Sequence, residues 1–272
     1  MLHKPFCSKC YKMKNKLTIV KIGGKIIEDE TSLHSFLENF ALLEGPKILV
    51  HGGGQKATEI SRDLGIETRL IEGRRVTNSE NLDIVIMVYA GLINKKITAL
   101  LQSNSCDSIG LSGADMNCIV SNKRPTVPLD FGWVGDIVHI NTSAIRLLLE
   151  QNITPVFCAL THDGKGQLLN TNADTIAAEI AIGMSNTYET KLIYCFDNQG
   201  VLQDVNDKNS IITHIDTNEY AALKANKTIQ QGMLPKMENA FNALNNHVAK
   251  VIIGDIRVID DKIHSQYTSL TL

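Results

Sequence analysis

Short runs of consecutive apolar residues alternate along this chain with segments in which apolar residues recur at every third or fourth position. The runs are rich in β-branched residues, as buried strands are, and include residues 17–22, 47–51, 153–160, 191–196 and 248–253. The periodic segments predict helices at residues 32–43, 55–64, 142–151, 175–183 and 218–224. This alternation predicts an α/β fold with a mainly parallel central sheet and helices on both faces. We expect residues 248–253 to be the closing core strand.

The most apolar of the predicted helices covers residues 79–102. Apolar side chains lie on most of its sides, so several of its faces have to be covered. Burial inside the subunit and burial against a second copy of the chain both account for this pattern. The preceding residues 67–76 alternate like a hairpin that carries Arg74 and Arg75.

Length and composition indicate how the chain is divided. Its 272 residues, 43% of them hydrophobic, suffice for one large α/β domain or two lobes. A polar stretch at residues 184–189 separates two well-patterned halves, so we expect an N-terminal lobe at 17–186 and a C-terminal lobe at 187–272. Residues 1–16 are expected to form a disordered extension outside the fold.

Charge and hydropathy exclude several classes of partner. With 27 basic and 29 acidic residues the net charge is −2, which gives no footprint for nucleic acid or an anionic membrane. No apolar run approaches the ~20 residues that span a bilayer, and the N-terminus lacks the apolar core of a signal peptide. We therefore expect a cytoplasmic protein.

The six cysteines fit a reducing compartment. Four of them stand singly in apolar or mixed segments, where a reduced cysteine acts as a small hydrophobe. Cys7 and Cys10 have the spacing of metal ligands, but no second pair follows to complete a tetrahedral site. We expect no protein-bound metal.

Two of the predicted strands run directly into glycines. The first ends at Lys21 and Ile22 before Gly23 and Gly24, and the second ends at His51 before residues 52–54, which are all glycine. Glycine has no Cβ, so backbone N–H groups at such a strand end form a donor site for phosphate or carboxylate. Two such loops suggest two anionic groups brought face to face, with Lys21 adding a positive charge.

Several common signatures are missing from the sequence. There is no Gly-x-x-x-x-Gly-Lys-Ser/Thr loop, no Gly-x-Gly-x-x-Gly loop and no protein-kinase motif set, which disfavours the corresponding nucleotide-binding folds. There is also no Gly-x-Ser-x-Gly elbow and no His-Glu-x-x-His, which disfavours the commonest hydrolases. Glycine loops and separated lysines remain as the candidate chemistry.

Six segments are informative together: IVKIGG (19–24), VHGGG (50–54), GRRVT (73–77), GWVG (132–135), LNTNAD (169–174) and GMLPK (232–236). They stand in the order in which they occur in the N-acetylglutamate kinases, and the chain resembles that family from about residue 17 to its C-terminus. Six motifs in the same order are far more specific than one glycine loop. The resemblance implies the amino-acid kinase fold, with two lobes in one subunit.

The resemblance also implies a reaction. The γ-phosphoryl group of ATP would pass to the side-chain carboxylate of N-acetyl-L-glutamate, giving N-acetyl-L-glutamyl 5-phosphate in arginine biosynthesis. Mg²⁺ is expected on the phosphates, with few or no protein ligands. Because the acceptor carboxylate is already ionised at neutral pH, no general base is required, and charge neutralisation with in-line positioning suffices.

Three charged residues receive catalytic roles from the resemblance. Lys21 would stabilise the transferring phosphoryl group, and Lys236 the charge that develops on the ADP oxygen. Asp174 would pair with both and keep their ammonium groups aimed. Alternatively, Asp174 only caps the helix that begins beside it, as aspartate does well.

Acceptor binding is expected from the residues Gly52, Gly53, Arg75, Asn170 and Asn172. Gly52 and Gly53 would hold the attacking carboxylate. Arg75 resembles the arginine that clamps the α-carboxylate, and the asparagines resemble those that bind the α-carboxylate and the amide. Each asparagine alone would more often be a turn residue.

Nucleotide binding is expected at the first glycine pair and over the C-terminal lobe. The residues implied are Gly23, Gly24, Asp197, Gly200, Ile229, Gln230, Gly232 and Met233. Gly23 and Gly24 would offer N–H groups to the β- and γ-phosphates. Phe196 and Gln231 depart from the family pattern, in which serine and a glycine or aspartate are frequent at these positions.

Arg74 leaves the acyl group of the substrate open. Family members commonly carry an apolar residue before the clamp arginine, and an extra guanidinium suits an acyl group with its own carboxylate, as in N-succinyl-L-glutamate. Adjacent residues of a strand point to opposite faces, so a solvated hairpin arginine is the competing interpretation.

Two further functions compete with acylglutamate phosphorylation. A kinase of the same fold acting on a nucleoside monophosphate, aspartate or free glutamate is disfavoured by the motifs at residues 73–77 and 170–174. A non-catalytic amino-acid sensor is disfavoured because binding alone does not need both phosphate-site lysines.

The expected assembly is a homodimer formed through the helix at residues 79–102. Arginine-inhibited relatives carry a longer N-terminal helix that is used in hexamers. The segment before residue 17 is short, basic and interrupted by Pro5. We therefore expect a dimer that is insensitive to arginine.

Overall fold

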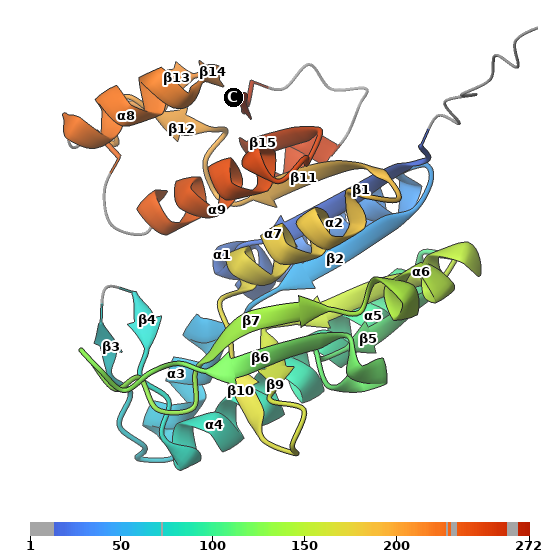
Figure 1. Ribbon diagram of the computed structural model, residues 1–272, viewed down its shortest axis with the longest axis vertical. Coiled ribbons are helices and arrows are strands. Elements are labelled where there is room, and N and C mark those ends of the chain that lie inside the picture. The colour runs from blue at the N-terminus through green and yellow to red at the C-terminus, as the bar shows by residue number, and fades with distance from the viewer. Residues whose placement is uncertain (1–13, 72, 227, 230–232, 260–265) are drawn as a thin grey trace, which may run out of the picture.

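The computed structural model of the protein describes residues 14–71, 73–226, 228–229, 233–259 and 266–272. Cys7 and Cys10, and the predicted extension as far as residue 13, lie outside the described residues. The described residues form two sheets, two small hairpins and the helices that cover them (Figure 1).

The larger sheet has eight strands and confirms the predicted α/β class. In spatial order they are β14 (His214–Ile215), β16 (Thr268–Leu270), β15 (Lys250–Gly254), β11 (Glu189–Cys195), β1 (Lys16–Ile22), β2 (Lys47–His51), β8 (Thr154–Cys158) and β5 (Ser108–Leu111). Neighbouring strands from β15 to β5 are parallel, whereas β15 and β16 are antiparallel. The predicted core strand at 248–253 is present as the buried β15, but it is not the closing strand, because β16 follows it in the chain and pairs outside it.

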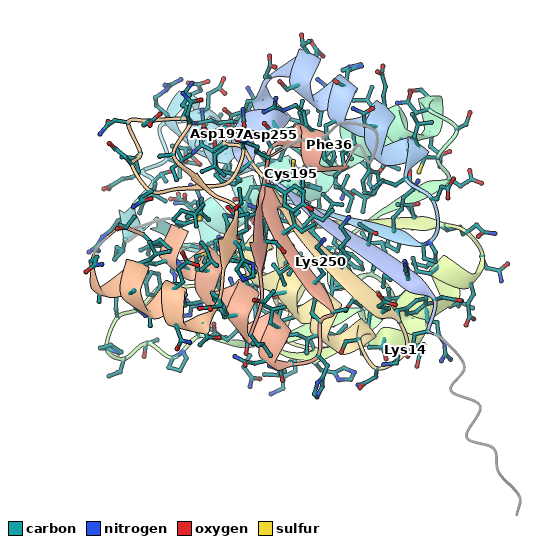
Figure 2. All side chains as sticks on the ribbon, turned by 90° about the horizontal axis from the view of Figure 1, so that it is seen from above. Lys14, Phe36, Cys195, Asp197, Lys250 and Asp255 are labelled. Carbon is teal, nitrogen blue, oxygen red and sulfur yellow. The ribbon has the colours of Figure 1, made fainter. Side chains whose placement is uncertain are left out.

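Strand register aligns five strand ends in one row across this sheet. Ile22 pairs with both His51 and Cys195, His51 pairs with Cys158, and Cys195 pairs with Gly254. Figure 2 shows this edge near Cys195, with Lys14 and Lys250 toward the opposite edge. Since adjacent strands lie about 4.8 Å apart, the two glycine loops leave the sheet side by side.

Helices cover both faces of the larger sheet. They are α1 (Gly24–Glu28), α2 (Glu30–Leu42), α3 (Gly54–Asp63), α4 (Ser79–Val85), the π-helical η1 (Ile86–Ile93), α5 (Asn94–Ser103), α6 (Thr142–Glu150), α7 (Ala173–Met184), α8 (Thr217–Ala225) and α9 (Met233–Asn245). One face carries α7, which packs on β1, β2 and β11, together with α9 on β15 (Figure 1). The described part of the chain also contains two short 3₁₀ turns, η2 (Asp115–Asn117) and η3 (Ile256–Ile259).

Local polar contacts fix the ends of several helices. The Asp29 side chain caps α2 by accepting a hydrogen bond of 2.9 Å from the Ser32 N–H. At the other end of α2, Lys47 Nζ donates to the carbonyl oxygens of Ala41 (2.6 Å) and Leu43 (2.7 Å). Lys47 is the first residue of β2, so this contact ties the helix end to the strand that leads into the second glycine loop.

A smaller sheet was not expected from the sequence. It contains β10 (Leu168–Asn170), β9 (Leu160–His162), β6 (Ile119–Lys123) and β7 (Gly135–Ile140) in that spatial order. The predicted hairpin at residues 67–76 is present as β3 (Leu70–Ile71) and β4 (Arg74–Arg75), and a second hairpin joins β12 (Val201–Leu202) to β13 (Ile211–Ile212). In Figure 1 the smaller sheet and the first hairpin lie together at one end of the molecule.

The long apolar helix is continuous from Ser79 to Ser103 but changes its winding in the middle. Among the described residues it is the one helix that length and composition would allow to cross a membrane, with a mean hydropathy of 1.6 in its most apolar part. It packs against β5, β8 and β9, which uses much of its apolar surface. Met87 and Leu92 of this helix remain 56% and 50% exposed.

Candidate active site

A cavity of about 840 Å³ opens where the two glycine loops leave the larger sheet. Both loops line it, together with α3, the β3–β4 hairpin, the start of α7 and the start of α9. Its lining residues include Lys21, Gly24, Gly52, Gly53, Arg74, Arg75, Asn170, Asn172 and Asp174. The fold therefore brings acceptor-binding and catalytic candidates from distant parts of the chain into one space.

The second glycine loop presents three backbone donors to this cavity. Among the described residues, no acceptor is found for the N–H groups of Gly52, Gly53 and Gly54, and α3 begins at Gly54. Gly53 has φ +155°, a conformation that side chains rarely adopt, and a Cβ there would lie 2.5 Å from Ile93 Cδ1. Unpaired N–H groups at the start of a ten-residue helix suit a carboxylate or phosphate.

In the first glycine loop, the N–H of Gly23 does not have the phosphate-binding role that was expected of it. The N–H of Gly23 donates to the Cys195 carbonyl oxygen at 2.8 Å, which continues the pairing of β1 with β11. That N–H is therefore not available to a phosphate, and the contribution of Gly23 is limited to close approach of its backbone. For the N–H of Gly24, no acceptor is found in the described part of the chain.

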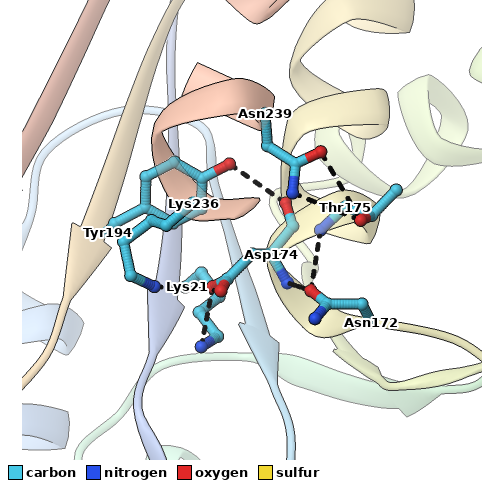
Figure 3. A network of polar contacts seen from close by, with 7 residues as sticks. All are labelled: Lys21, Asn172, Asp174, Thr175, Tyr194, Lys236 and Asn239. Carbon is cyan, nitrogen blue, oxygen red and sulfur yellow. Dashed lines mark hydrogen bonds and ion pairs between the residues drawn. The ribbon is translucent and has the colours of Figure 1, made fainter. Parts of the chain in front are cut away.

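The three predicted catalytic residues form one cluster (Figure 3). Asp174 Oδ1 lies 2.7 Å from Lys21 Nζ, and Asp174 Oδ2 accepts a hydrogen bond of 2.9 Å from Lys236 Nζ. Lys21 comes from the end of β1, Asp174 from the first turn of α7 and Lys236 from the first turn of α9. All three side chains are at least 86% buried, so water screens the cluster little.

Electrostatics within the cluster favour two ammonium groups on one carboxylate. Burial alone would raise the pKa of Asp174, but the charges of Lys21 and Lys236 hold it well below its usual range. Burial, reinforced by the charge of Lys21, lowers the pKa of Lys236 against the opposing effect of Asp174. The cluster carries a net positive charge and can therefore stabilise an additional anion.

The cap of α7 is Asn172 and not Asp174. Asn172 Oδ1 accepts hydrogen bonds from the N–H groups of Asp174 (2.7 Å) and Thr175 (3.2 Å). This frees the Asp174 carboxylate for the lysines and excludes the interpretation in which it only caps the helix. The oxygen of Asn172 is committed to the helix, so only its amide N–H₂ group is left for a ligand.

Arg75 is held more tightly by the protein than a carboxylate clamp would need. Its NH2 nitrogen donates to the Gly54 carbonyl (2.7 Å) and Thr58 Oγ1 (2.6 Å), and its NH1 nitrogen donates to Thr68 Oγ1 (3.1 Å). Arg75 is 7% exposed. Its terminal fork thus ties the β3–β4 hairpin to α3, while its positive charge remains at the cavity wall.

Arg74 lines the same cavity but differs from Arg75 in exposure and in hydrogen bonding. It is exposed, as expected for the neighbour of a buried strand residue, and among the described residues its guanidinium has no hydrogen-bond or ion-pair partner. Asn170 is buried, and its amide donates to Thr77 Oγ1 at 3.0 Å. The structure therefore brings both arginines and Asn170 to the cavity, and within the described ranges the Arg74 guanidinium has no partner.

Two smaller cavities continue from the catalytic cluster toward the C-terminal part of the chain. One of about 260 Å³ is lined by Lys21, Gly23, Gly24, Lys25, Phe196, Asp197, Met233 and Lys236. The next, of about 330 Å³, shares Met233 with it and is also lined by Gly200, Leu202, Thr228 and Ile229. Every nucleotide-site residue expected from the sequence lines one of these two cavities, except Gln230 and Gly232, which lie outside the described residues.

Sequence reasoning missed four residues of the site. Lys25 pairs with Asp197 across the smaller cavity, and a lysine directly after the glycine pair was a signal that could have been used. Tyr89 lines the larger cavity from η1, and burial raises its pKa while Arg75 opposes this. His51 and Asn94 form a buried contact behind the second glycine loop. Periodicity alone placed Tyr89 and Asn94 in an apolar helix and could not reveal that they face the loop.

Comparison with known proteins gives a consistent result. The model of the amino acid kinase family matches residues 16–255. The acetylglutamate kinase of Cytophaga hutchinsonii is 50% identical over 254 residues, which cover 93% of this chain and 96% of that protein. The acetylglutamate kinase of Phocaeicola vulgatus is 49% identical over 241 residues, which cover 89% and 94%.

A solved structure extends this likeness to the fold. The N-acetylglutamate synthase from Neisseria gonorrhoeae, crystallised with coenzyme A and N-acetyl-glutamate, matches with a TM-score of 0.80 at 20% identity. The match covers 96% of this chain and 60% of that chain. At this identity the likeness concerns the fold alone.

Proposed function

The chain belongs to the amino acid kinase family, and from that premise we propose that it transfers the γ-phosphoryl group of ATP to the side-chain carboxylate of N-acetyl-L-glutamate. The product is N-acetyl-L-glutamyl 5-phosphate, and the reaction is a step of arginine biosynthesis. Relatives that are about half identical over most of the chain and are named acetylglutamate kinase support this activity.

The observation that carries the mechanism is the cluster of two lysines on one buried carboxylate. Phosphoryl transfer through a loose transition state needs charge neutralisation more than covalent help. Lys21, beside both cavities, is proposed to stabilise the transferring group, and Lys236 to neutralise the charge that builds on the leaving ADP oxygen. Asp174 keeps the two ammonium groups 2.7 and 2.9 Å from its oxygens and so fixes their direction before substrates bind.

The larger cavity is proposed to hold the acceptor. The N–H groups of Gly52 and Gly53 suit the attacking carboxylate, which is ionised without a general base. The positive charge of Arg75 and the amides of Asn170 and Asn172 are proposed to bind the α-carboxylate and the acetamido group. Because the carboxylate and the phosphates repel each other, donors on both loops are needed to bring them together.

The two smaller cavities are proposed to hold ATP, with the phosphates near Lys21 and Gly24 and the adenosine near Gly200, Ile229 and Met233. Gln230 and Gly232 belong to this proposal from the sequence. The described residues contain no group of three or more His, Cys, Asp or Glu side chains placed to hold a metal. Mg²⁺ is therefore proposed to arrive on the nucleotide phosphates and to add positive charge there.

The activity is tested by trapping the acyl phosphate. Hydroxylamine converts it to a hydroxamate, which is measured beside ADP release with purified protein, ATP, Mg²⁺ and N-acetyl-L-glutamate. We expect equal amounts of hydroxamate and ADP. ADP release without hydroxamate, or no turnover at saturating substrates, would overturn the proposal and would favour a sensor or a kinase with another acceptor.

N-succinyl-L-glutamate is a second candidate acceptor because of Arg74. This guanidinium lies on the acceptor cavity beside Arg75, and none of the described residues pairs with it. A succinyl carboxylate offers a bidentate partner, whereas an acetyl group does not. If the succinyl compound is preferred, its kcat/KM exceeds that of the acetyl compound and falls in Arg74→Ala, which leaves the acetyl value unchanged. An equal or higher kcat/KM for N-acetyl-L-glutamate excludes the preference.

We also propose a cytoplasmic homodimer that is insensitive to arginine. The four described cysteines are buried free thiols, as in a reducing compartment. The exposed Met87 and Leu92 on the 79–103 helix give the apolar surface that a twofold contact would cover. Sedimentation of the purified protein tests the dimer, and the rate of hydroxamate formation with and without arginine tests its insensitivity.

A further inference from the structure

The peptide bond between Gly52 and Gly53 has to keep one orientation for the acceptor site to work. Neither residue has a side chain, so rotation of this peptide unit by half a turn meets little local hindrance. In a planar trans peptide the C=O of one residue and the N–H of the next point in opposite directions. A rotated Gly52–Gly53 peptide would therefore turn an oxygen, instead of the Gly53 N–H, toward the acceptor carboxylate.

One side chain holds this peptide from the protein interior. His51 is completely buried, and its Nδ1 lies 2.8 Å from the Gly52 carbonyl oxygen. A carbonyl oxygen only accepts, so Nδ1 carries the hydrogen of the ring. Because the Gly52 C=O is directed to the His51 ring, the Gly53 N–H is directed away from it, on the side where the glycines line the cavity.

A second contact fixes which nitrogen of His51 carries the hydrogen. Asn94 Nδ2 lies 3.0 Å from His51 Nε2 and donates to the Val156 carbonyl oxygen at 2.9 Å. An amide N–H₂ group only donates, so Nε2 has to be the unprotonated acceptor. Asn94 is 1% exposed, and its Oδ1 faces Gly110 so closely that a Cβ at Gly110 would collide with it.

Burial also keeps the ring neutral. It lowers the pKa of His51 to about 4, although the hydrogen bond to Gly52 opposes the shift. A neutral ring with hydrogen on Nδ1 satisfies both contacts at once, whereas the other neutral tautomer satisfies neither. The hydrogen bonds that run from Val156 through Asn94 and His51 to Gly52 are thus all satisfied by one placement of the hydrogen on the His51 ring.

We infer that His51 is a positioning residue that locks the Gly52–Gly53 peptide with the Gly53 N–H toward the acceptor carboxylate, and that Asn94 sets the tautomer required for this. The inference rests on the proposed function in so far as it names the carboxylate of an acylglutamate as the group received. His51 itself touches neither substrate and transfers no proton. Its effect acts through the backbone of the loop.

Two substitutions separate the two contacts of the ring. In His51→Asn the amide nitrogen occupies nearly the place of Nδ1 and can still donate to the Gly52 oxygen. In His51→Gln the longer side chain reaches the place of Nε2 and can accept from Asn94, but it loses the donor to Gly52. Both variants remove a buried imidazole, so each serves as the matched control for the other.

Steady-state kinetics, and calorimetry of acceptor binding, should then distinguish the two variants. We expect His51→Gln to lose about tenfold or more in kcat and in affinity for the acceptor, with KM for ATP within about twofold, as for a misplaced anion donor. His51→Asn should keep most of the parent's activity. Equal losses in both variants, or a loss that affects ATP as much as the acceptor, would show a merely structural role and overturn the inference.

A crystal structure of each variant gives a readout that does not depend on the reaction. The Gly52–Gly53 peptide should be reversed, or present in two orientations, in His51→Gln and unchanged in His51→Asn. One unchanged orientation in His51→Gln refutes the lock even if the enzyme phosphorylates N-acetyl-L-glutamate. Conversely, a parent protein that forms no hydroxamate refutes the proposed function. The orientation of the Gly52–Gly53 peptide in the variants still shows whether His51 holds it.

Discussion

Replacing Asp174 by asparagine removes the negative charge from the catalytic cluster and changes its shape very little. The two ammonium groups of Lys21 and Lys236, now 2.7 and 2.9 Å from the carboxylate oxygens, would remain together without a counter-charge. Both lysine side chains are at least 87% buried, so water compensates for little of the loss. Removing one partner of a buried ion pair typically costs about 3–5 kcal/mol, and we expect the free energy of unfolding to fall by about 3 kcal/mol.

The same charge argument gives two further results for Asp174→Asn. Phosphates can replace the lost carboxylate, so ATP should stabilise the variant against urea by more than the roughly 2.7 kcal/mol that a ligand gives the parent at 100 times its Kd. The lysines lose the group that aims them, so kcat should fall by about 10² while KM for ATP stays equal or decreases.

The measurements are urea unfolding followed by circular dichroism, with and without a non-hydrolysable ATP analogue, and hydroxamate formation. Glu150→Gln is the matched control, because Glu150 pairs with Arg146 on the exposed surface of α6, where a pair contributes at most about 1 kcal/mol. The reasoning is refuted if Asp174→Asn unfolds within about 0.5 kcal/mol of that control, or if the nucleotide stabilises it no more than the parent.

Four other changes test separate parts of the site. Lys236→Ala should lower kcat by about 10² through loss of leaving-group stabilisation, and turnover within threefold of the parent would contradict that role. Arg75→Lys should raise KM for the acceptor about tenfold more than KM for ATP, since an ammonium group cannot make all the hydrogen bonds of the Arg75 guanidinium. Equal changes in the two KM values would argue against a role of Arg75 in the acceptor site. Gly53→Ala should lower the free energy of unfolding by about 3 kcal/mol, because the φ of +155° disfavours a side chain and a Cβ there would collide with Ile93. An unchanged Tm in a thermal scan would contradict this. His51 has a folded-state pKa of about 4, below the unfolded value of about 6.5. Its contribution to the free energy of unfolding is therefore complete above pH 6.5 and falls by about 2 kcal/mol by pH 5. His51→Asn should lack this part of the pH dependence when urea unfolding is measured at pH 7 and pH 5.

The secondary structure was largely predictable because strand and helix signals are local. The predicted helices at 32–43, 55–64 and 142–151 are present, and no end is shifted by more than two residues. The smaller sheet escaped prediction because its strands are short and pair antiparallel or across long separations. The π-helical segment in the middle of the apolar helix also left no mark in the periodicity. Its Tyr89 and Ile93 side chains lie where a Cβ on Gly53 would stand, a contact between segments far apart in the chain.

The sequence by itself determined most strands and helices of the larger sheet, the two glycine loops and the identity of the charged residues, because these follow from local propensity and from motifs in a fixed order. Only the tertiary structure decided which groups are free to act. Pairing of β1 with β11 takes the N–H of Gly23, and capping of α7 by Asn172 frees the carboxylate of Asp174. Strand register and helix packing make these choices between residues far apart in the chain, so no local pattern can contain them.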